Sequence, residues 1–219
     1  MLACRSDMLI PDFFQVSKFT KEAYGTSPCP KKYLPYLWMY RFNIKTGHVT
    51  DGPVANGKVS GEFPTINPAY SMVKTQFLYL AMVDGLGWGI QMNGVAKFDL
   101  EKDTTITWNA GEKTYCGEPV FVASKQEGKE DDGYLVTFCH CESSSASFLV
   151  ILDARSLQVV AKIHTHYRIP YGFHGIWVKK ADVAYQSGLK RKLVNEKEYL
   201  AGLTLWKRLW LKTVQLLGN

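Results

Sequence analysis

The chain has 219 residues, of which 46% are hydrophobic and 21% are charged. This balance supplies enough apolar surface for a folded core and too little charge for a disordered chain. No window approaches the ~18 uninterrupted apolar residues of a membrane-spanning helix, and the first residues lack the apolar stretch of ~7–15 residues that a secretory signal needs.

The net charge of +6 is concentrated at the C-terminus. Residues 179–219 contain nine basic and three acidic side chains, whereas residues 1–178 contain 17 of each sign. A neutral body offers no basic face to a polyanion, so we expect no nucleic-acid partner.

The cysteine pattern argues against a disulfide framework and against a zinc ribbon, because the number is odd and no pair has CxxC spacing. Cys139, His140 and Cys141 alternate between the two faces of a strand, so they cannot close on one ion. We therefore interpret the thiols as reduced and expect a cytoplasmic protein. The five cysteines are Cys4, Cys29, Cys116, Cys139 and Cys141.

Three segments differ in character. Residues 1–33 show no regular pattern and contain three prolines. Residues 34–178 contain short runs of β-branched and aromatic residues separated by turn signals, which predicts an antiparallel all-β meander. No amphipathic helix interrupts these runs, so a parallel α/β sheet is excluded. The predicted strands lie within residues 36–44, 77–83, 94–100, 104–108, 119–123, 134–140, 147–154 and 159–166.

A loose repeat runs through this β region. Glu62, Glu118 and His174 follow one another at intervals of 56 residues, each after a glycine and before an apolar run. Each interval holds about four short strands, which is typical of the blades of a β-propeller. In that geometry the innermost strand of every blade faces the central axis. The spacing therefore predicts that the three side chains converge there.

Two interpretations of these three residues stand side by side. His174 lies between an aromatic and a glycine, where it could serve as a metal ligand or as a buried histidine bonded to a carbonyl. A carboxylate on a buried strand needs a partner, and a ligand histidine offers its second ring N–H. Glu62 and Glu118 are thus either orienting carboxylates behind histidine ligands or acids on surface turns.

The remaining histidines are weaker candidates for a site. His164 and His166 share one strand face with no third ligand nearby, and His48 follows a turn. We interpret His164, His166 and His140 as structural, and we expect His48 to be exposed. The sequence contains no glycine-rich phosphate loop, no GxSxG and no HExxH.

The basic tail has a pattern of its own. Between residues 188 and 217 apolar side chains recur at three- and four-residue steps, with Lys and Arg between them. This predicts a basic amphipathic helix. It could lie on a membrane surface with its tryptophans at the lipid boundary, pack against its own sheet region, or have no fold.

Several motifs resemble the carotenoid cleavage oxygenase family, which also contains stilbene-cleaving dioxygenases and a retinoid isomerase. They occur in family order over about residues 34–178. The most specific are GEPVFV, the EDDG turn, LDARSL and GFHG. The full set is LPYLWMYRFNIKTG, GEFPTIN, GVAKFDL, GEPVFV, EDDGYLVTF, LVILDARSL with VVAKIH, and RIPYGFHGIWV.

The resemblance implies a seven-bladed β-propeller with a non-haem Fe2+ on its axis, held by four histidines and three orienting glutamates. It implies oxidative cleavage of a C=C bond by O2 in a carotenoid, apocarotenoid or stilbene-like substrate. His174 matches the last of the four ligands, and Glu62 and Glu118 match two of the orienting glutamates. No separate organic cofactor is implied.

The sequence also departs from the family. The other three ligand histidines have no counterpart here, and residues 179–219 follow the point where the family usually ends. One imidazole cannot hold Fe2+ firmly. We therefore expect three to four blades, a C-terminal helix, and an oxygenase fragment that is inactive alone. The rival hypothesis is a non-catalytic β module that binds a protein or a membrane through its open edge and basic tail.

Overall fold

The computed structural model describes residues 2–5, 34–86, 90–124, 128–172, 174–180 and 182–183. The chain divides into two compact units, residues 1–177 and 178–219, and all described strands belong to the first. The helix predicted at 188–217 lies outside the described residues. Within the described part of the chain, no helix is long and apolar enough to cross a membrane.

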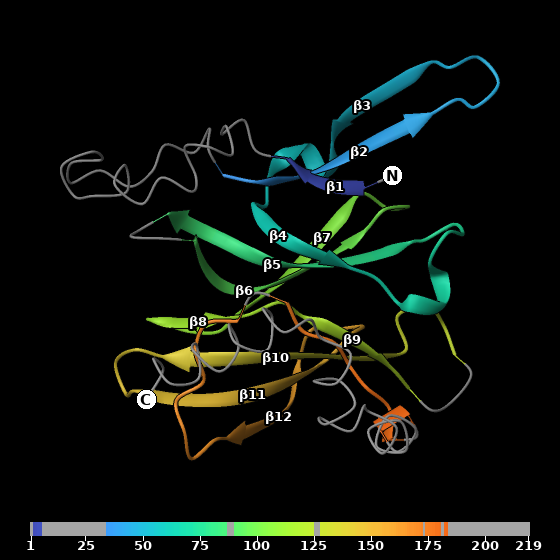
Figure 1. Cartoon of the computed structure of the whole chain (residues 1–219). Helices are drawn as coiled ribbons and strands as arrows, with labels where there is room; N and C mark the ends of the chain where they lie inside the picture. Colours follow the sequence, from blue (N-terminus) through green and yellow to red (C-terminus); the bar gives the residue numbers. More distant parts are fainter. Residues whose placement is uncertain are drawn as a thin grey trace, which may run out of the picture. The chain divides into compact units, whose positions relative to one another are not determined.

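Three antiparallel sheets make up the first unit (Figure 1). The strand orders are β1-β2-β3, then β4-β5-β6-β7, then β12-β11-β10-β8 with β9 also paired to β10. The strands are β1 (Leu2–Arg5), β2 (Tyr36–Phe42), β3 (Val49–Pro53), β4 (Gly61–Thr65), β5 (Phe77–Leu86), β6 (Ile90–Asp99), β7 (Thr104–Asn109), β8 (Thr114–Cys116), β9 (Val120–Ala123), β10 (Gly133–Cys141), β11 (Ala146–Asp153) and β12 (Val159–His164).

The all-β prediction is confirmed, and each of the eight predicted runs contains a strand. The strand expected directly after His174, at residues 176–178, does not form. Four strands were not predicted: β1, β3, β4 and β8. All four lie at sheet edges or pair with a single neighbour, where Gly, Asp and Pro are tolerated because fewer backbone groups must pair. The sequence predicts a strand that ends at residue 83 and a turn at the Asp84-Gly85 pair that follows. This turn is wrong, since β5 continues to Leu86.

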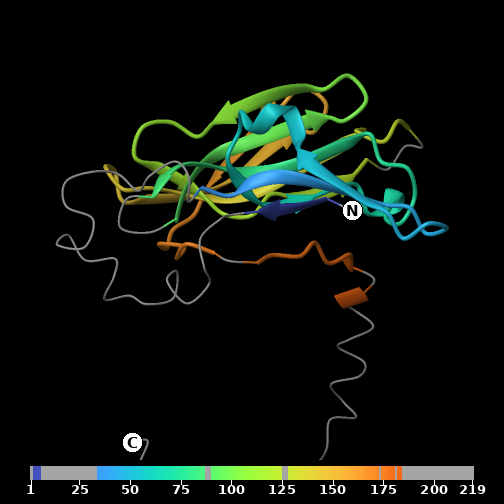
Figure 2. The same ribbon diagram turned by 90° about the horizontal axis from the view of Figure 1, so that it is seen from above.

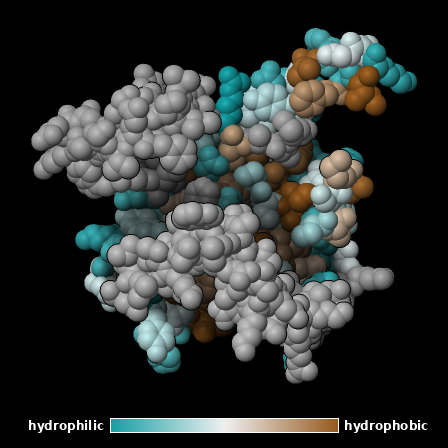
Figure 3. Space-filling view, viewed as in Figure 1, coloured by the Kyte–Doolittle hydropathy of each residue, from teal (hydrophilic) through white to brown (hydrophobic). Residues whose placement is uncertain are grey.

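The β2–β3 hairpin leaves apolar side chains at its end in solvent. Phe42, Ile44 and Val49 are all exposed there, and Figure 3 shows brown, hydrophobic atoms at the upper right, where Figure 1 draws the hairpin tip. Isolated exposed apolar side chains are normal on a protein surface, so the tip alone defines no site.

The two central strands of the middle sheet, β5 and β6, are buried on both faces, whereas the edge strand β7 is largely exposed. Along β5, Leu78 and Leu80 pack toward the first sheet with Leu37, while Tyr79 packs toward the third sheet. This explains why FLYLAMV reads as a continuous apolar run rather than an alternating one. Each fully buried large side chain contributes about 1.5–3 kcal/mol, so these two interfaces dominate the cohesion of the unit.

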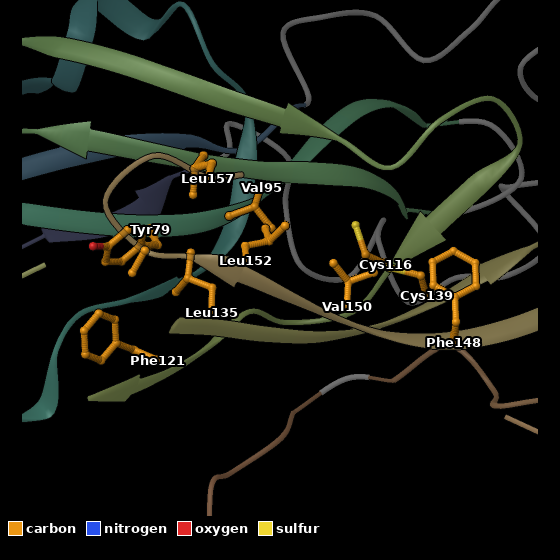
Figure 4. Close-up of a cluster of buried hydrophobic side chains, with 11 residues drawn as sticks. Tyr79, Val95, Cys116, Phe121, Leu135, Cys139, Phe148, Val150, Leu152 and Leu157 are labelled. Atoms are coloured by element: carbon orange, nitrogen blue, oxygen red, sulfur yellow. The ribbon is translucent and has the colours of Figure 1, made fainter. Parts of the chain in front are cut away.

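The cluster between the second and third sheets is drawn in Figure 4. β5 and β6 contribute one side of it and β8 to β11 the other. Its buried members are Tyr79, Val95, Cys116, Phe121, Leu135, Cys139, Phe148, Val150, Leu152, Ala154 and Leu157.

A buried ion pair joins the same two sheets. Lys97 on β6 donates to Asp131 at 2.7 Å, with both side chains 7% exposed, and also to the Arg155 carbonyl at 3.0 Å. The Arg155 side chain in turn pairs with Asp132. The motifs GVAKFDL, EDDG and LDARSL therefore meet at one structural cross-link, which needs all its partners because a buried charge is costly alone.

Candidate metal-ligand site

His174 lies against Glu118. The distance from His174 Nδ1 to Glu118 Oε2 is 3.2 Å, and the Gly175 amide donates to the same oxygen at 2.9 Å. The Glu118 side chain is 19% exposed and that of His174 64%. Two donors converging on one carboxylate oxygen fix both the imidazole and the backbone that follows it.

Local structure places these groups. Glu118 precedes the buried Pro119 and the strand β9, and Gly175 lies beside Val120, where an added Cβ would make an ordinary contact at 3.6 Å. The segment after β12, orange in Figure 2, runs along one side of the sheets. It therefore carries His174 to the beginning of β9.

Hydrogen bonds to the third sheet hold the segment before His174. Ser147 on β11 accepts from the amide of Thr165 through its carbonyl and from the amide of Ile169 through its hydroxyl. The Tyr171 hydroxyl donates to Glu142. This bond lowers the pKa of the Glu142 carboxyl, while burial and then that carboxylate raise the pKa of Tyr171 to about 12.

Phe63 packs its ring on the imidazole. The ring centroids of Phe63 and His174 are 5.1 Å apart at an interplanar angle of 66°. Phe63 has φ +57°, unusual for a bulky residue, and it lies in a β-bulge between Glu62 and Thr65. The bulge turns the phenyl ring into a buried cluster with Ala81.

Glu62 has a different partner. Its carboxylate accepts from the Cys4 thiol, and burial raises its pKa above the ordinary 4.5. Burial, followed by the Glu62 charge, raises the pKa of the thiol to about 12. β1 pairs with β2, and the hydrogen bond from Cys4 to Glu62 also connects β1 to β4.

The structure thus brings Glu118 and His174 into contact. Phe63, which follows Glu62 in the bulge, packs on the His174 ring. Sequence reasoning missed Phe63 and Cys4. The positive φ of Phe63 has no sequence signal beyond the following proline. Cys4 lies in a segment where no regular element was expected.

The other histidines have structural surroundings. His140 is buried, with Nδ1 2.8 Å from the Ser147 hydroxyl. His164 packs on Phe148 at 5.7 Å between ring centroids, and His48 and His166 are both exposed. Among the described residues, no three His, Cys, Asp or Glu side chains come together as a metal site.

Comparisons with known proteins give the class. The family model described as retinal pigment epithelial membrane protein (RPE65) matches residues 1–179. The 9-cis-epoxycarotenoid dioxygenase NCED1, chloroplastic, of Oryza sativa subsp. japonica is 39% identical over 155 residues, 67% of this chain and 24% of the relative. Carotenoid 9,10(9',10')-cleavage dioxygenase 1 of Arabidopsis thaliana is 28% identical over 202 residues, 85% of this chain and 35% of the relative.

Solved structures agree with these sequence matches. A variant of the Synechocystis apocarotenoid oxygenase superposes with a TM-score of 0.62 at 25% identity, covering 68% of this chain and 31% of that chain. The cobalt-substituted form gives a TM-score of 0.63 at 23% identity, over 71% and 32%. The described fold is all-β and resembles part of the fold of these apocarotenoid oxygenases. The chain belongs to the RPE65/carotenoid oxygenase family, as the motif resemblance predicted.

The match is partial in one respect. The chain spans about a quarter to a third of the length of these relatives. The activities in their names belong to proteins three to four times as long as the matched region.

Proposed function

We propose that this chain is part of a carotenoid-cleaving oxygenase and supplies one iron-ligand histidine, His174, together with its orienting carboxylate, Glu118. The observation that carries the proposal is the 3.2 Å contact between His174 Nδ1 and Glu118. A neutral imidazole that donates from Nδ1 presents its lone pair at Nε2, which is the arrangement of a carboxylate-oriented metal ligand.

The described residues do not fit a complete iron site. They offer one imidazole with its carboxylate and no group of three ligands, and one ligand does not retain Fe2+. Further histidines have to come from outside the described residues of this chain. When bound by the full set, non-haem Fe2+ would supply the O2 chemistry that cleaves a C=C bond.

The residues of this chain would hold the ligand histidine in place and would not themselves react with the substrate. Glu118 holds the imidazole tautomer, Phe63 restrains the ring, and Tyr171 with Glu142 fixes the preceding segment. Glu62, at the start of the bulge, would orient a histidine that this chain does not contain. The substrate would be an apolar polyene, either a carotenoid or an apocarotenoid, as the names of the relatives suggest, or a stilbene-like alkene, as the motif resemblance implies.

The three sheets would be blades of a seven-bladed propeller. Two sheets of four and five strands, following one another along the chain, support this assignment, as does the superposition on an apocarotenoid oxygenase. The tail at 188–217 would form an amphipathic helix and touch a membrane surface. Chloroplast relatives make the plastid the alternative to a cytoplasmic location.

The experiment compares the chain alone with a chimera. In the chimera, residues 34–178 replace the aligned third of the Synechocystis apocarotenoid oxygenase. We expect the 219-residue chain alone to bind no iron tightly and to cleave no apocarotenoid. The chimera should retain about one iron per chain and cleave the substrate.

Variants of the chimera assign the roles. His174→Ala should lose iron, whereas His166→Ala, the matched control, should keep it. Tight iron binding or cleavage by the chain alone would contradict the proposal, as would an iron-loaded His174→Ala chimera. If the chimera does not fold, an immunoblot of the native protein against residues 172–178 decides: a band no larger than 24.8 kDa would overturn the assignment to a larger enzyme.

A further inference from the structure

Two buried cysteines lie side by side on adjacent strands of the third sheet. Cys116 on β8 is the direct register partner of Cys139 on β10, and both side chains enter the cluster between the second and third sheets (Figure 4). The two thiols hydrogen-bond to each other, and Cys116 also donates to the Met92 carbonyl at 3.4 Å. We propose that Cys116 and Cys139 form an oxidisable dithiol that closes to a cross-strand disulfide.

The ladder of hydrogen bonds shows that the backbone geometry suits this bond. The Gly117 amide donates to the Phe138 carbonyl at 2.9 Å, so residues 117 and 138 form a hydrogen-bonded pair. Such pairs alternate with non-hydrogen-bonded ones along an antiparallel ladder, which makes Cys116 and Cys139 a non-hydrogen-bonded pair. Cα atoms of these pairs lie about 4.5 Å apart, within the range of about 4.4–6.8 Å that disulfides span.

The reaction balances with a peroxide as oxidant. One thiol attacks the O–O bond of hydrogen peroxide and becomes a sulfenic acid, with release of one water. The second sulfur attacks the first, the S–S bond forms, and the sulfenic oxygen leaves as a second water. Two electrons pass from the sulfurs to the peroxide, and both thiol protons end in the two waters.

The burial of Cys116 and the short length of β8 determine how fast the disulfide forms. Hydrogen bonding with Cys139 and burial keep Cys116 in its thiol form, with a raised pKa, so the closed sheet reacts slowly. β8 has three residues and, among the described strands, pairs with β10 alone, so its local opening gives a small oxidant access. Closure of the disulfide would tie β8 to β10 two residues before Glu118.

The test uses the full chain. Reduced protein is incubated with hydrogen peroxide or with buffer, free thiols are blocked with N-ethylmaleimide, and the protein is digested with trypsin without reduction. Cys116 lies in the tryptic peptide 114–125 and Cys139 in 130–155. We expect these two peptides to be joined and lighter by two hydrogen atoms than their sum, and dithiothreitol to separate them.

Cys141 provides the matched control, because it lies in the same peptide and is more exposed. Hydrogen bonds from its serine neighbours lower its pKa to about 6, so it should react with peroxide first. The Cys141→Ser chain should still form the crosslink, and Cys139→Ser should not. Fragmentation of the crosslinked wild-type peptide gives the same assignment if Cys139→Ser does not fold. A bond to Cys141, or separate peptides carrying only blocked or over-oxidised thiols, would overturn the proposal.

Discussion

The Glu118 carboxylate serves two donors at once, the imidazole of His174 and the amide of Gly175. A hydrogen bond to a charged acceptor is worth about 1.5–3 kcal/mol. Partial exposure places this one at the lower end. The carboxylate therefore restrains the backbone around His174 as well as its ring.

Glu118→Ala should release this backbone. We expect the Gly175 amide to exchange its hydrogen roughly tenfold faster, the equivalent of about 1.4 kcal/mol, as measured by hydrogen–deuterium exchange. Glu112→Ala changes an exposed acid and serves as the control. Unchanged exchange at Gly175 in Glu118→Ala would mean that the hydrogen bond does not hold the segment in solution.

Glu62 gives the pH dependence of stability a definite sign. Its folded pKa is raised above the ordinary 4.5, so the folded chain holds this proton more tightly than the unfolded chain does. The stability therefore falls as pH rises from 4.5 through the raised folded pKa. Glu62→Gln should flatten this fall in urea-unfolding midpoints measured between pH 4 and 7, and Glu112→Gln should leave it as in wild type.

The contact between Glu118 and His174 follows the equal 56-residue spacing seen in the sequence, although His174 lies in a segment after β12 that forms no strand rather than on a further sheet. Its metal role stays a prediction. The link between Glu62 and Cys4 could not be anticipated, since it depends on a strand, β1, whose four residues carry no pattern of their own. The bulge at Phe63 depends on tertiary packing against Ala81, and its local signal is limited to the proline that follows it.

At the scale of elements, β4 and β5 approach unusually closely. A Cβ added to Gly61 would lie 2.1 Å from Leu80 Cδ1 and 2.5 Å from the Ala81 carbonyl oxygen. The leucine side chain can move, but the carbonyl belongs to the middle of a buried strand. Gly61 therefore permits the pairing that positions Glu62 and Phe63.

Gly61→Ala should separate these strands and destabilise the chain by about 1–3 kcal/mol, the range for an overpacked core. Gly52→Ala is the control, because a Cβ added at residue 52 would meet no atom within 4 Å and the residue has no positive φ. Urea unfolding measures both. Equal midpoints for the two variants would show that the strands relax without cost.

The second and third sheets are also joined by charge. Removing one partner of a buried ion pair typically costs about 3–5 kcal/mol, because the other charge stays desolvated. Lys97→Met should therefore lower the free energy of unfolding by about 3 kcal/mol, the lower end, since Arg155 approaches Asp131 at 3.9 Å. Lys74→Met, which removes an exposed pair with Glu101, should leave the urea midpoint unchanged.

At the scale of the whole molecule, the outer face of the third sheet is apolar. Phe138, Leu149 and Ile163 form one row across β10, β11 and β12, and Phe138 and Ile163 are 49% and 51% exposed. In the proposed propeller a further blade would cover this row. In the chain alone it remains a hydrophobic patch, which favours association.

We expect the purified chain to self-associate through this row. Phe138→Glu should shift it toward monomer in sedimentation velocity, because a carboxylate at the centre of the row has no partner in the associated state. Val73→Glu adds the same charge at an exposed loop residue and should leave association unchanged. If both variants associate like wild type, the interface lies elsewhere. The apolar row on the third sheet is then not the uncovered surface that a missing propeller blade would leave.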